Sequence, residues 1–465
     1  MIFVIQYESH KFNTMFGRNK SKKHTTLISK RDSKITKHKK PSTKGKPDIQ
    51  ILIVSTFLTL FGVIMVFSAS AFLSLQNESF NNDPFYIFNR HLIWIFASVI
   101  FAYIFYKLPI NSLTKLSLVW IIIMIVIMIY MLPEALSSIA DPQTCRKAIE
   151  MPLVNTKNCG TRWIDLGFFD MQPSEFIKIP LIIFTAYWIS LGDKSKKKVE
   201  EYIKRFKNNE VLHFILYVSL VFLPFLLLAI VVLLVLAQRD LDSAIVIAVP
   251  IIAIYFAATT KRSQIYSLIG VLVIGVFAGL LLVTQQDYRR GRSDSYVEIL
   301  LEGEPSVQSQ SSTGFQVWHG LIAIGSGGVF GKGYNESREK FYYLQEAAYT
   351  DSIFAVTAEE FGLIGSVTIL LSFLFLGSRG FRNASENPSK FESYVIIGIT
   401  TWILIQAFLN IAANLSIIPF AGMPLPFFSY GGSNTLMILI AIGVLLNLSR
   451  KHISTRDNPL FRRRI

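Results

Sequence analysis

The chain is dominated by continuous apolar runs that are each long enough to cross a lipid bilayer. A transmembrane helix needs about 20 apolar residues, and unbroken rather than alternating runs favour helices over a β-barrel. Hydrophobic residues make up 51% of the 465 positions and charged residues only 17%, which excludes an ordinary soluble domain. We therefore predict an all-α polytopic membrane protein of about ten transmembrane helices. The predicted spans lie near residues 50–73, 90–108, 112–132, 174–192, 212–236, 242–259, 264–284, 352–377, 393–415 and 433–449.

Basic residues mark one side of this predicted bundle. Residues 1–48 hold thirteen Lys and Arg against three acidic residues, and the connections after the fourth, sixth and eighth spans are also basic. An even number of spans separates these segments, so they share one face, which the positive-inside rule assigns to the cytoplasm. Both termini are then cytoplasmic, and the long segment 285–350 between the seventh and eighth helices is an outer loop. The net charge of +15 follows from this topology and does not indicate nucleic-acid binding.

Three segments follow along the chain. Residues 1–48 and 451–465 are predicted to be basic cytoplasmic tails, the first of them disordered. Residues 49–450 form the transmembrane domain, with outer loops at about 133–172 and 285–350. Cys145 and Cys159 share the first outer loop, which predicts a disulfide on an oxidising face, with free thiols as the alternative. No metal site is predicted, since no His or second Cys pair accompanies these cysteines.

Two polar segments flank predicted outer helix ends. In residues 160–180, GTRWIDLGFFDMQPSEFIKIP, Pro173 suits the first turn of a helix, and Glu175 and Lys178 follow at a spacing that places them on one face. This pair either neutralises itself at the interface or lines a water-filled cavity. The second segment, AQRDLDSA at 237–244, is a short charged turn between the fifth and sixth spans.

Two further segments are rich in glycine or proline and lie at or near the predicted membrane. Residues 320–334 are rich in glycine, which suits either a flexible loop or a backbone that approaches a ligand closely, although no Walker motif is present. Residues 410–436 hold three prolines and the pair Gly431–Gly432. Such broken backbone is tolerated where it is buried in protein or lines a cavity, and it also occurs in transporters.

An acidic residue, Asp351, stands at the predicted outer boundary of the eighth span, within FYYLQEAAYTDSIFAVTAEE at 341–360. Thr350 or Asp351 could cap this helix by accepting hydrogen bonds from its first backbone N–H groups. A carboxylate at such a boundary is also costly to bury and readily acquires a shifted pKa, which is typical of functional sites. Both interpretations stand on this segment alone.

Together these segments resemble the SEDS family (shape, elongation, division and sporulation) of FtsW/RodA peptidoglycan glycosyltransferases. The resemblance runs from about residue 50 to residue 450. It rests on the following motifs in family order: VIMVFSASA, DPFYIFNRHLIW, GTRWIDLGFFDMQPSEFIKI, IAIGSGGVFGKG, YLQEAAYTDSIFAVTAEEFGLIG and MPLPFFSYGGSN. The resemblance implies that Asp351 is the catalytic carboxylate and that Glu175 and Lys178 line an outer cavity. The other substrate-binding residues that we expect on this basis are Gln172, Ser174, Arg162, Asp240, Glu346, Ser429, Gly431 and Gly432.

The chain departs from the family pattern in the outer loops. The family's QPDLG-like turn contains Arg239 in place of proline and Asp242 in place of glycine. Tyr349 replaces the usual histidine before Thr-Asp, and Gln345 replaces the proline of the YLPE motif. These substitutions question the local geometry of the loops, while the three charged cavity residues are retained.

The resemblance implies polymerisation of lipid II into glycan strands on the outer face of the bacterial cytoplasmic membrane, with release of polyprenyl pyrophosphate. Asp351 would be the general base, and the early motifs favour an FtsW-like division role over elongation. Lys178, outer arginines or a divalent cation (Mg²⁺ or Mn²⁺) would assist the leaving pyrophosphate. Expected partners are a class B penicillin-binding transpeptidase and other divisome or elongasome membrane proteins. A flippase for the lipid-linked precursor and a non-catalytic scaffold are the alternatives.

Overall fold

A computed structural model describes residues 43–137, 150–157, 160–167, 169–191, 223–259, 313–419, 422–450 and 452–453. The chain divides into two units, Met1–Lys44 with His452–Ile465, and Gly45–Lys451. In the first unit, β1 (Thr43–Lys44) and β5 (His452–Ile453) form a short antiparallel pair. The predicted disulfide and most of both predicted tails lie outside the described residues.

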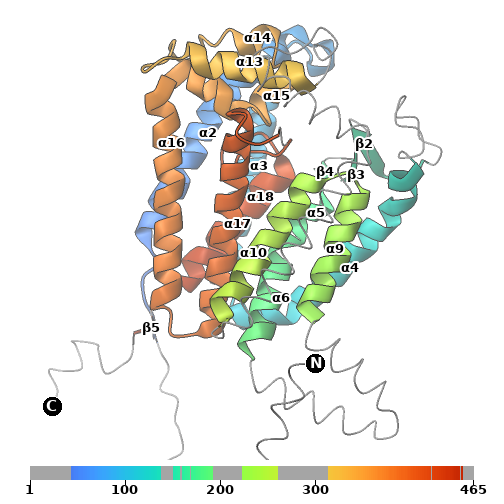
Figure 1. Cartoon of the computed structure of the whole chain (residues 1–465), viewed down its shortest axis with the longest axis vertical. Coiled ribbons are helices and arrows are strands. Elements are labelled where there is room, and N and C mark those ends of the chain that lie inside the picture. Colours follow the sequence, from blue (N-terminus) through green and yellow to red (C-terminus); the bar gives the residue numbers. More distant parts are fainter. Residues whose placement is uncertain are drawn as a thin grey trace, which may run out of the picture. The chain divides into compact units, whose positions relative to one another are not determined.

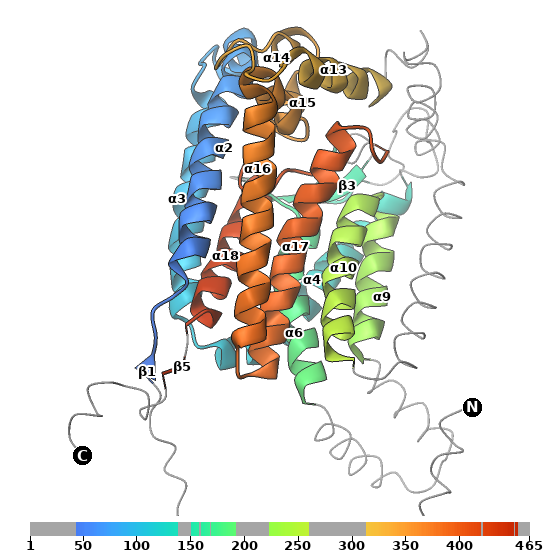
Figure 2. The same cartoon turned by 60° about the vertical axis from the view of Figure 1, so that its left-hand side comes forward.

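The second unit consists mostly of helices, and its long helices run side by side in both views (Figures 1 and 2). The helices are α2 (Ile49–Gln76), η3 (Glu78–Phe80), α3 (Tyr86–Lys107), α4 (Ile110–Ser137), α5 (Pro173–Phe176), α6 (Lys178–Ser190), α9 (Leu223–Ala237), α10 (Leu241–Ala258), α13 (Thr313–Ser326), α14 (Glu339–Tyr342), α15 (Glu346–Tyr349), α16 (Ile353–Glu386), α17 (Lys390–Asn414) and α18 (Gly432–Leu448). Helices α13 and α14 lie across one end of the long helices.

Six of the described helices, α2, α3, α4, α10, α16 and α17, are long and apolar enough to span a bilayer, and α9 and α18 are shorter apolar helices. The prediction of a polytopic helical membrane protein is therefore confirmed. Its count of about ten spans stays a prediction, because the expected span at 264–284 and the start of the one at 212–236 lie outside the described residues. The sequence did not predict a small antiparallel sheet of β2 (Val154–Lys157), β3 (Gly160–Asp165) and β4 (Asp170–Met171) in the first outer loop.

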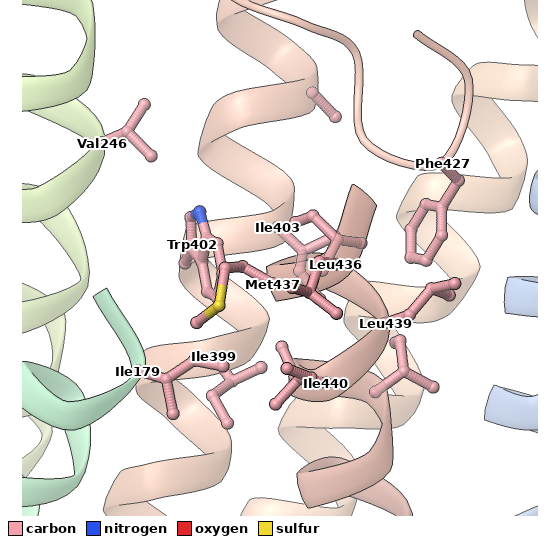
Figure 3. Packing of buried hydrophobic residues seen from close by; sticks show 14 of the residues in the cluster. Ile179, Val246, Ile399, Trp402, Ile403, Phe427, Leu436, Met437, Leu439 and Ile440 are labelled. Atoms are coloured by element: carbon pink, nitrogen blue, oxygen red, sulfur yellow. The ribbon is translucent and has the colours of Figure 1, made fainter. Parts of the chain in front are cut away.

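The hydrophobic core is centred on α17 and α18. Figure 3 shows Trp402 and Ile403 of α17 in the same cluster as Met437 and Ile440 of α18, and all four side chains are buried. Helix α18 is buried over nearly its whole length, which explains why its sequence is apolar on every face. A rigid, buried α18 provides a fixed surface for the loop that precedes it.

Helix α16 is broken near its N-terminal end. Gly362 has φ 65° and ψ −157°, a conformation that is essentially restricted to glycine. The glycine-rich segment packs against this break: the N–H groups of Leu363 and Ile364 donate to the carbonyls of Gly328 and Val329 at 2.9 and 3.2 Å. Residues 327–333 therefore form a backbone clamp on α16, which explains their glycine content without a bound ligand.

Replacing Gly362 by alanine is expected to destabilise the protein by about 1–3 kcal/mol, the usual cost of a residue held in a glycine-only conformation. A Cβ atom there would also collide with the backbone of Gly331 and Val329. The measurement is the thermal unfolding midpoint of the purified protein in detergent. Gly325→Ala in α13 is the control, since a Cβ at that position meets nothing within 4 Å. An equal midpoint for wild type and Gly362→Ala would contradict the clamp.

At the opposite end of the bundle, Asp48 joins three helices. Its carboxylate caps α2 by accepting from the N–H of Gln50 at 3.0 Å, and it accepts from Arg379 Nη2 at 2.7 Å and Asn383 Nδ2 at 2.9 Å on α16. Its own N–H donates to Ser449 Oγ, just after α18, at 3.0 Å. The start of α2 is thereby tied to the C-terminal parts of α16 and α18.

Asp48→Asn is expected to lower thermal stability at neutral pH and to have little effect in acid. Burial alone would raise the pKa of Asp48, but hydrogen bonds from Asn383, Arg379 and the Gln50 N–H outweigh it and lower this pKa. The carboxylate therefore stabilises the fold above the ordinary aspartate pKa of about 3.9, and this contribution is lost as the pH falls through the lower folded value. Thermal midpoints of wild type and variant, measured against pH, should converge only in acid. A gap that persists unchanged in acid would argue against this assignment.

Candidate active site

The predicted pair of Glu175 and Lys178 forms at the start of the fourth predicted span. Pro173 opens α5, and α6 begins at Lys178 after the single residue Ile177. Lys178 Nζ lies 2.6 Å from Glu175 Oε1, and both residues are only 3% exposed. The pair is thus buried in protein. Among the described residues, the second carboxylate oxygen of Glu175 and the hydroxyl of buried Ser174 have no hydrogen-bond partner.

The Lys178 amine reaches from this pair to α17. It lies 3.5 Å from Gln406 Oε1 and 5.2 Å from the centre of the Trp402 ring, a cation–π distance. The Gln406 side chain also donates to the Pro424 carbonyl at 3.0 Å and to Asn434 Oδ1 at 2.8 Å. Gln406 therefore joins the charged pair to the broken segment 422–431 and to the start of α18.

The same face of α17 also holds Asp351. The residues that bind it lie one and two helical turns after Gln406. Asn410 Nδ2 and Asn414 Nδ2 both donate to the main-chain carbonyl of Asp351, at 2.9 and 3.0 Å. Asn410 Nδ2 also donates to the Met423 carbonyl at 2.7 Å. Four residues of helix rise about 6 Å, so Gln406, Asn410 and Asn414 form an amide ridge that links the charged pair to Asp351.

Sequence reasoning missed this amide ridge. Its signal is present in LIQAFLNIAANLS, where an amide side chain recurs every fourth residue within an apolar span. Residues at this spacing share one helix face, and a buried amide needs hydrogen-bond partners. A polar stripe of this kind therefore indicates contact with another polar element, although not which one.

The broken segment before α18 lies against the main chain beside Asp351. Buried Ser429 donates to the Thr350 carbonyl at 2.5 Å and accepts from the Leu425 N–H at 2.7 Å. The N–H of Tyr430 donates to the Tyr349 carbonyl at 2.9 Å. This confirms that the non-helical backbone at 422–431 is buried in protein, and it brings Ser429 next to Asp351.

Arg162, Gln172 and Asp240 form a second polar group. Arg162 Nη1 lies 3.9 Å from Asp240 Oδ1, and its Nη2 donates to the Arg239 carbonyl at 2.6 Å. Gln172 Nε2 donates to Asp240 Oδ2 at 3.1 Å, and the Gln172 N–H donates to Ser433 Oγ at 3.2 Å. The sheet, the α9–α10 turn and the start of α18 therefore meet at three of the predicted residues.

Residues 49–454 match the sequence profile of the FtsW/RodA/SpoVE family, described as cell cycle proteins. The chain belongs to this family. Stage V sporulation protein E of Bacillus subtilis is 34% identical over 408 residues, which cover 88% of this chain and 98% of that protein. A probable peptidoglycan glycosyltransferase FtsW of Geobacter sulfurreducens is 33% identical over 406 residues, covering 87% and 95%.

Solved structures share the fold. One is a chain from a peptidoglycan synthase complex that coordinates polymerization and crosslinking, with a TM-score of 0.61 and 21% identity over 88% of this chain and 99% of that chain. Another is the rod shape determining protein RodA of Thermus thermophilus, with a TM-score of 0.53 and 20% identity over 88% and 98%. The predicted resemblance to the SEDS family is confirmed.

The departures from the FtsW/RodA pattern preserve the contacts of the α9–α10 turn. Arg239 has φ 62°, and Asp240 nevertheless reaches Gln172. Asp242 Oδ2, at the position of the family's glycine, accepts from the Gly422 N–H at 3.0 Å and so binds the broken segment. With these substitutions, the turn is held by hydrogen bonds to Gln172 and to the Gly422 N–H.

The tyrosine at the family's histidine position has an aromatic environment. The Tyr349 ring packs edge-on against Tyr430 at 5.7 Å, and burial raises the pKa of Tyr349 well above its ordinary value. The Tyr349 phenol therefore stays protonated at neutral pH. Gln345, at the proline position, has φ 45°, a value that proline cannot adopt.

Three predicted residues have other surroundings. Glu346 is exposed on α15, and its carboxylate is not among the described groups that contact the amide ridge. Gly431 and Gly432 begin α18, and a Cβ on Gly432 would lie 2.5 Å from the Trp94 ring. Gly432 thus allows close packing of α18 on α3 (Tyr86–Lys107). Substrate contact for all three stays a prediction.

Asp351 lies one residue before the N-cap position of α16. Helix α16 begins at Ile353 with Ser352 in the N-cap position, and the Thr350 hydroxyl donates to the Glu346 carbonyl at 2.9 Å. The sequence had suggested Thr350 or Asp351 as the cap, whereas the N-cap position is one residue later, at Ser352. Asp351 is half-buried just outside the helix.

In the described part of the chain, no cluster of three or more His, Cys, Asp or Glu side chains could hold a metal ion. A divalent cation held by one or two carboxylates together with substrate phosphates needs no such cluster, and its involvement stays a prediction. No chemical step is assigned to a metal ion.

Proposed function

We propose that this chain is a peptidoglycan glycosyltransferase that polymerises lipid II into glycan strands on the outer face of the cytoplasmic membrane and releases polyprenyl pyrophosphate. The observation that carries the proposal is the amide ridge of α17, which links Asp351 to the buried pair of Glu175 and Lys178. Relatives named FtsW support a role in cell division, with elongation as the alternative.

Asp351 is suited to act as the general base. Its carboxylate accepts the proton of the acceptor sugar hydroxyl as the new C–O bond forms at the anomeric carbon of the donor. The bond from that carbon to the polyprenyl pyrophosphate breaks, and negative charge develops on the leaving group. Cationic side chains stabilise such charge, and Lys178 and Arg162 are the cations of the two polar groups. Substrate contact by Glu175 and Ser174 stays a prediction, since both residues are buried.

The distribution of charge supports an outer active site and cytoplasmic termini. Asp351 lies at the α13–α15 end of the bundle, and the opposite end holds Asp48 with Arg379, in a region that also includes Arg382 and Lys390. By the positive-inside rule, this basic end faces the cytoplasm. The proposed partner is a class B penicillin-binding transpeptidase, within the divisome or elongasome. The similar fold of a chain from a peptidoglycan synthase complex supports that partnership.

A flippase would need a polar path that reaches the inner side. The amide ridge instead stops at Gln406: the next residue on that face is Trp402, and the buried residues further along α17 are mostly apolar, such as Ile399 and Ile396. A polar ridge confined to one part of α17 favours an enzyme over a carrier.

The experiment that tests the function is glycan polymerisation from purified lipid-linked precursor by the purified full-length chain, with and without its cognate transpeptidase. Glycan strands resolved on a gel would support the proposal. Absence of polymer in every pairing, from protein that still binds the transpeptidase, would favour the scaffold.

A further inference from the structure

Two asparagines of α17 converge on a single main-chain atom. Asn410 and Asn414 are 0% and 4% exposed, and both donate to the carbonyl of Asp351. Asn414 Nδ2 also donates to the Asn410 carbonyl at 2.9 Å, which anchors its side chain along α17. A carbonyl oxygen with two amide donors is fully bonded, so the Asp351 peptide has a defined position.

The connection between α15 and α16 is a short turn, in which the N–H groups of Thr350 and Ser352 both donate to the Ala347 carbonyl, at 3.2 and 2.8 Å. Thr350 and Asp351 lie between the two helices, and α16 begins only at Ile353. The second Asn410 bond, to Met423, ties the broken segment to the same position. Asn410 therefore sets the distance between Asp351 and the segment that contains Ser429.

We propose that Asn410 and Asn414 are positioning residues, which hold the Asp351 carboxylate in register with the Glu175–Lys178 pair through the rigid frame of α17. This inference rests on the proposed glycosyltransferase function, and neither amide needs to touch substrate. A displacement of a catalytic group by 1 Å can cost about a hundredfold in rate. Loss of either asparagine therefore affects the chemical step more than substrate binding.

The test is steady-state polymerisation by Asn410→Leu and Asn414→Leu, which keep similar side-chain size but remove the donors. We expect kcat to fall about 10- to 100-fold with KM changed less than about threefold. Asn414→Leu is the milder variant, since it leaves the Asn410 bond to Asp351 in place. Thermal unfolding and size-exclusion chromatography of each variant verify that it is folded.

Asn447→Leu is the matched control. Asn447 is also a buried amide, 4% exposed, that donates to two main-chain carbonyls, those of Phe105 and Leu108, at 3.2 and 2.6 Å between α18 and the inner end of α3. It should lose similar thermal stability while keeping kcat. A fall in kcat as large for Asn447→Leu as for Asn410→Leu would show a general structural effect and overturn the inference.

A double-mutant cycle distinguishes a positioning role from a purely structural one. In an Asp351→Glu background, where the carboxylate is already displaced, Asn410→Leu should lower kcat by less than about threefold. An equal fall in both backgrounds would overturn the inference. An active wild type with unaffected asparagine variants would overturn the inference alone, whereas an inactive wild type would overturn the proposed function as well.

Discussion

Replacing Asp351 by asparagine is expected to lower glycan polymerisation by about 10²- to 10⁴-fold, the range typical of a lost general base. Asparagine has nearly the same shape, and the main-chain carbonyl that Asn410 and Asn414 bind is unchanged. The fold should therefore persist, and only the ability to accept a proton is lost. The measurement is the initial rate of strand formation from purified precursor, for wild type and variant at equal folded concentration.

Asp83→Asn is a matched control for this experiment. Asp83 is also a half-buried outer aspartate, and its carboxylate accepts from the N–H of Phe85 at 2.9 Å in the turn before α3. Asparagine can accept the same bond, so the rate should stay near that of wild type. Equal polymerisation by wild type and Asp351→Asn would remove Asp351 from the chemistry, and the amide ridge would then require another explanation.

Lys340→Met is expected to have the largest effect on stability, about 3–5 kcal/mol, the usual cost of removing one partner of a buried ion pair. Lys340 Nζ lies 2.6 Å from Glu360 Oε1, 2.7 Å from Ser68 Oγ and 2.8 Å from Asn335 Oδ1. Lys340 is only 3% exposed and Glu360 only 1%. Without the amine, the Glu360 carboxylate is buried without a compensating charge, and the contact of α14 and α16 with α2 is weakened.

Thermal unfolding in detergent measures this effect, and two further variants define it. Arg382→Met removes a comparable contact to Glu386, but the Arg382 side chain is 64% exposed, so little change is expected. Combining Lys340→Met with Glu360→Gln should recover part of the lost stability, since the unpaired charge is removed as well. A double variant less stable than Lys340→Met alone would contradict the charge argument.

The sequence by itself determined those structural features that depend only on residues close together in the chain. Apolar runs identified the membrane-spanning class, and Pro173 marked the start of a helix. The three-residue spacing of Glu175 and Lys178 predicted a pair that the structure contains. Such predictions succeed because helix geometry alone places residues three and four apart on one face.

Only the tertiary structure decided which polar groups meet. Asn410 and Asn414 could be recognised as polar in an apolar span, yet their partner, the carbonyl of Asp351, lies 59 and 63 residues away in sequence. Ser68 and Glu360 meet across 292 residues. The glycines of 327–333 indicated either close approach of the backbone or flexibility. They did not predict the broken helix α16 against which they pack. A main-chain carbonyl carries no sequence signature, so its partner is set by how helices pack.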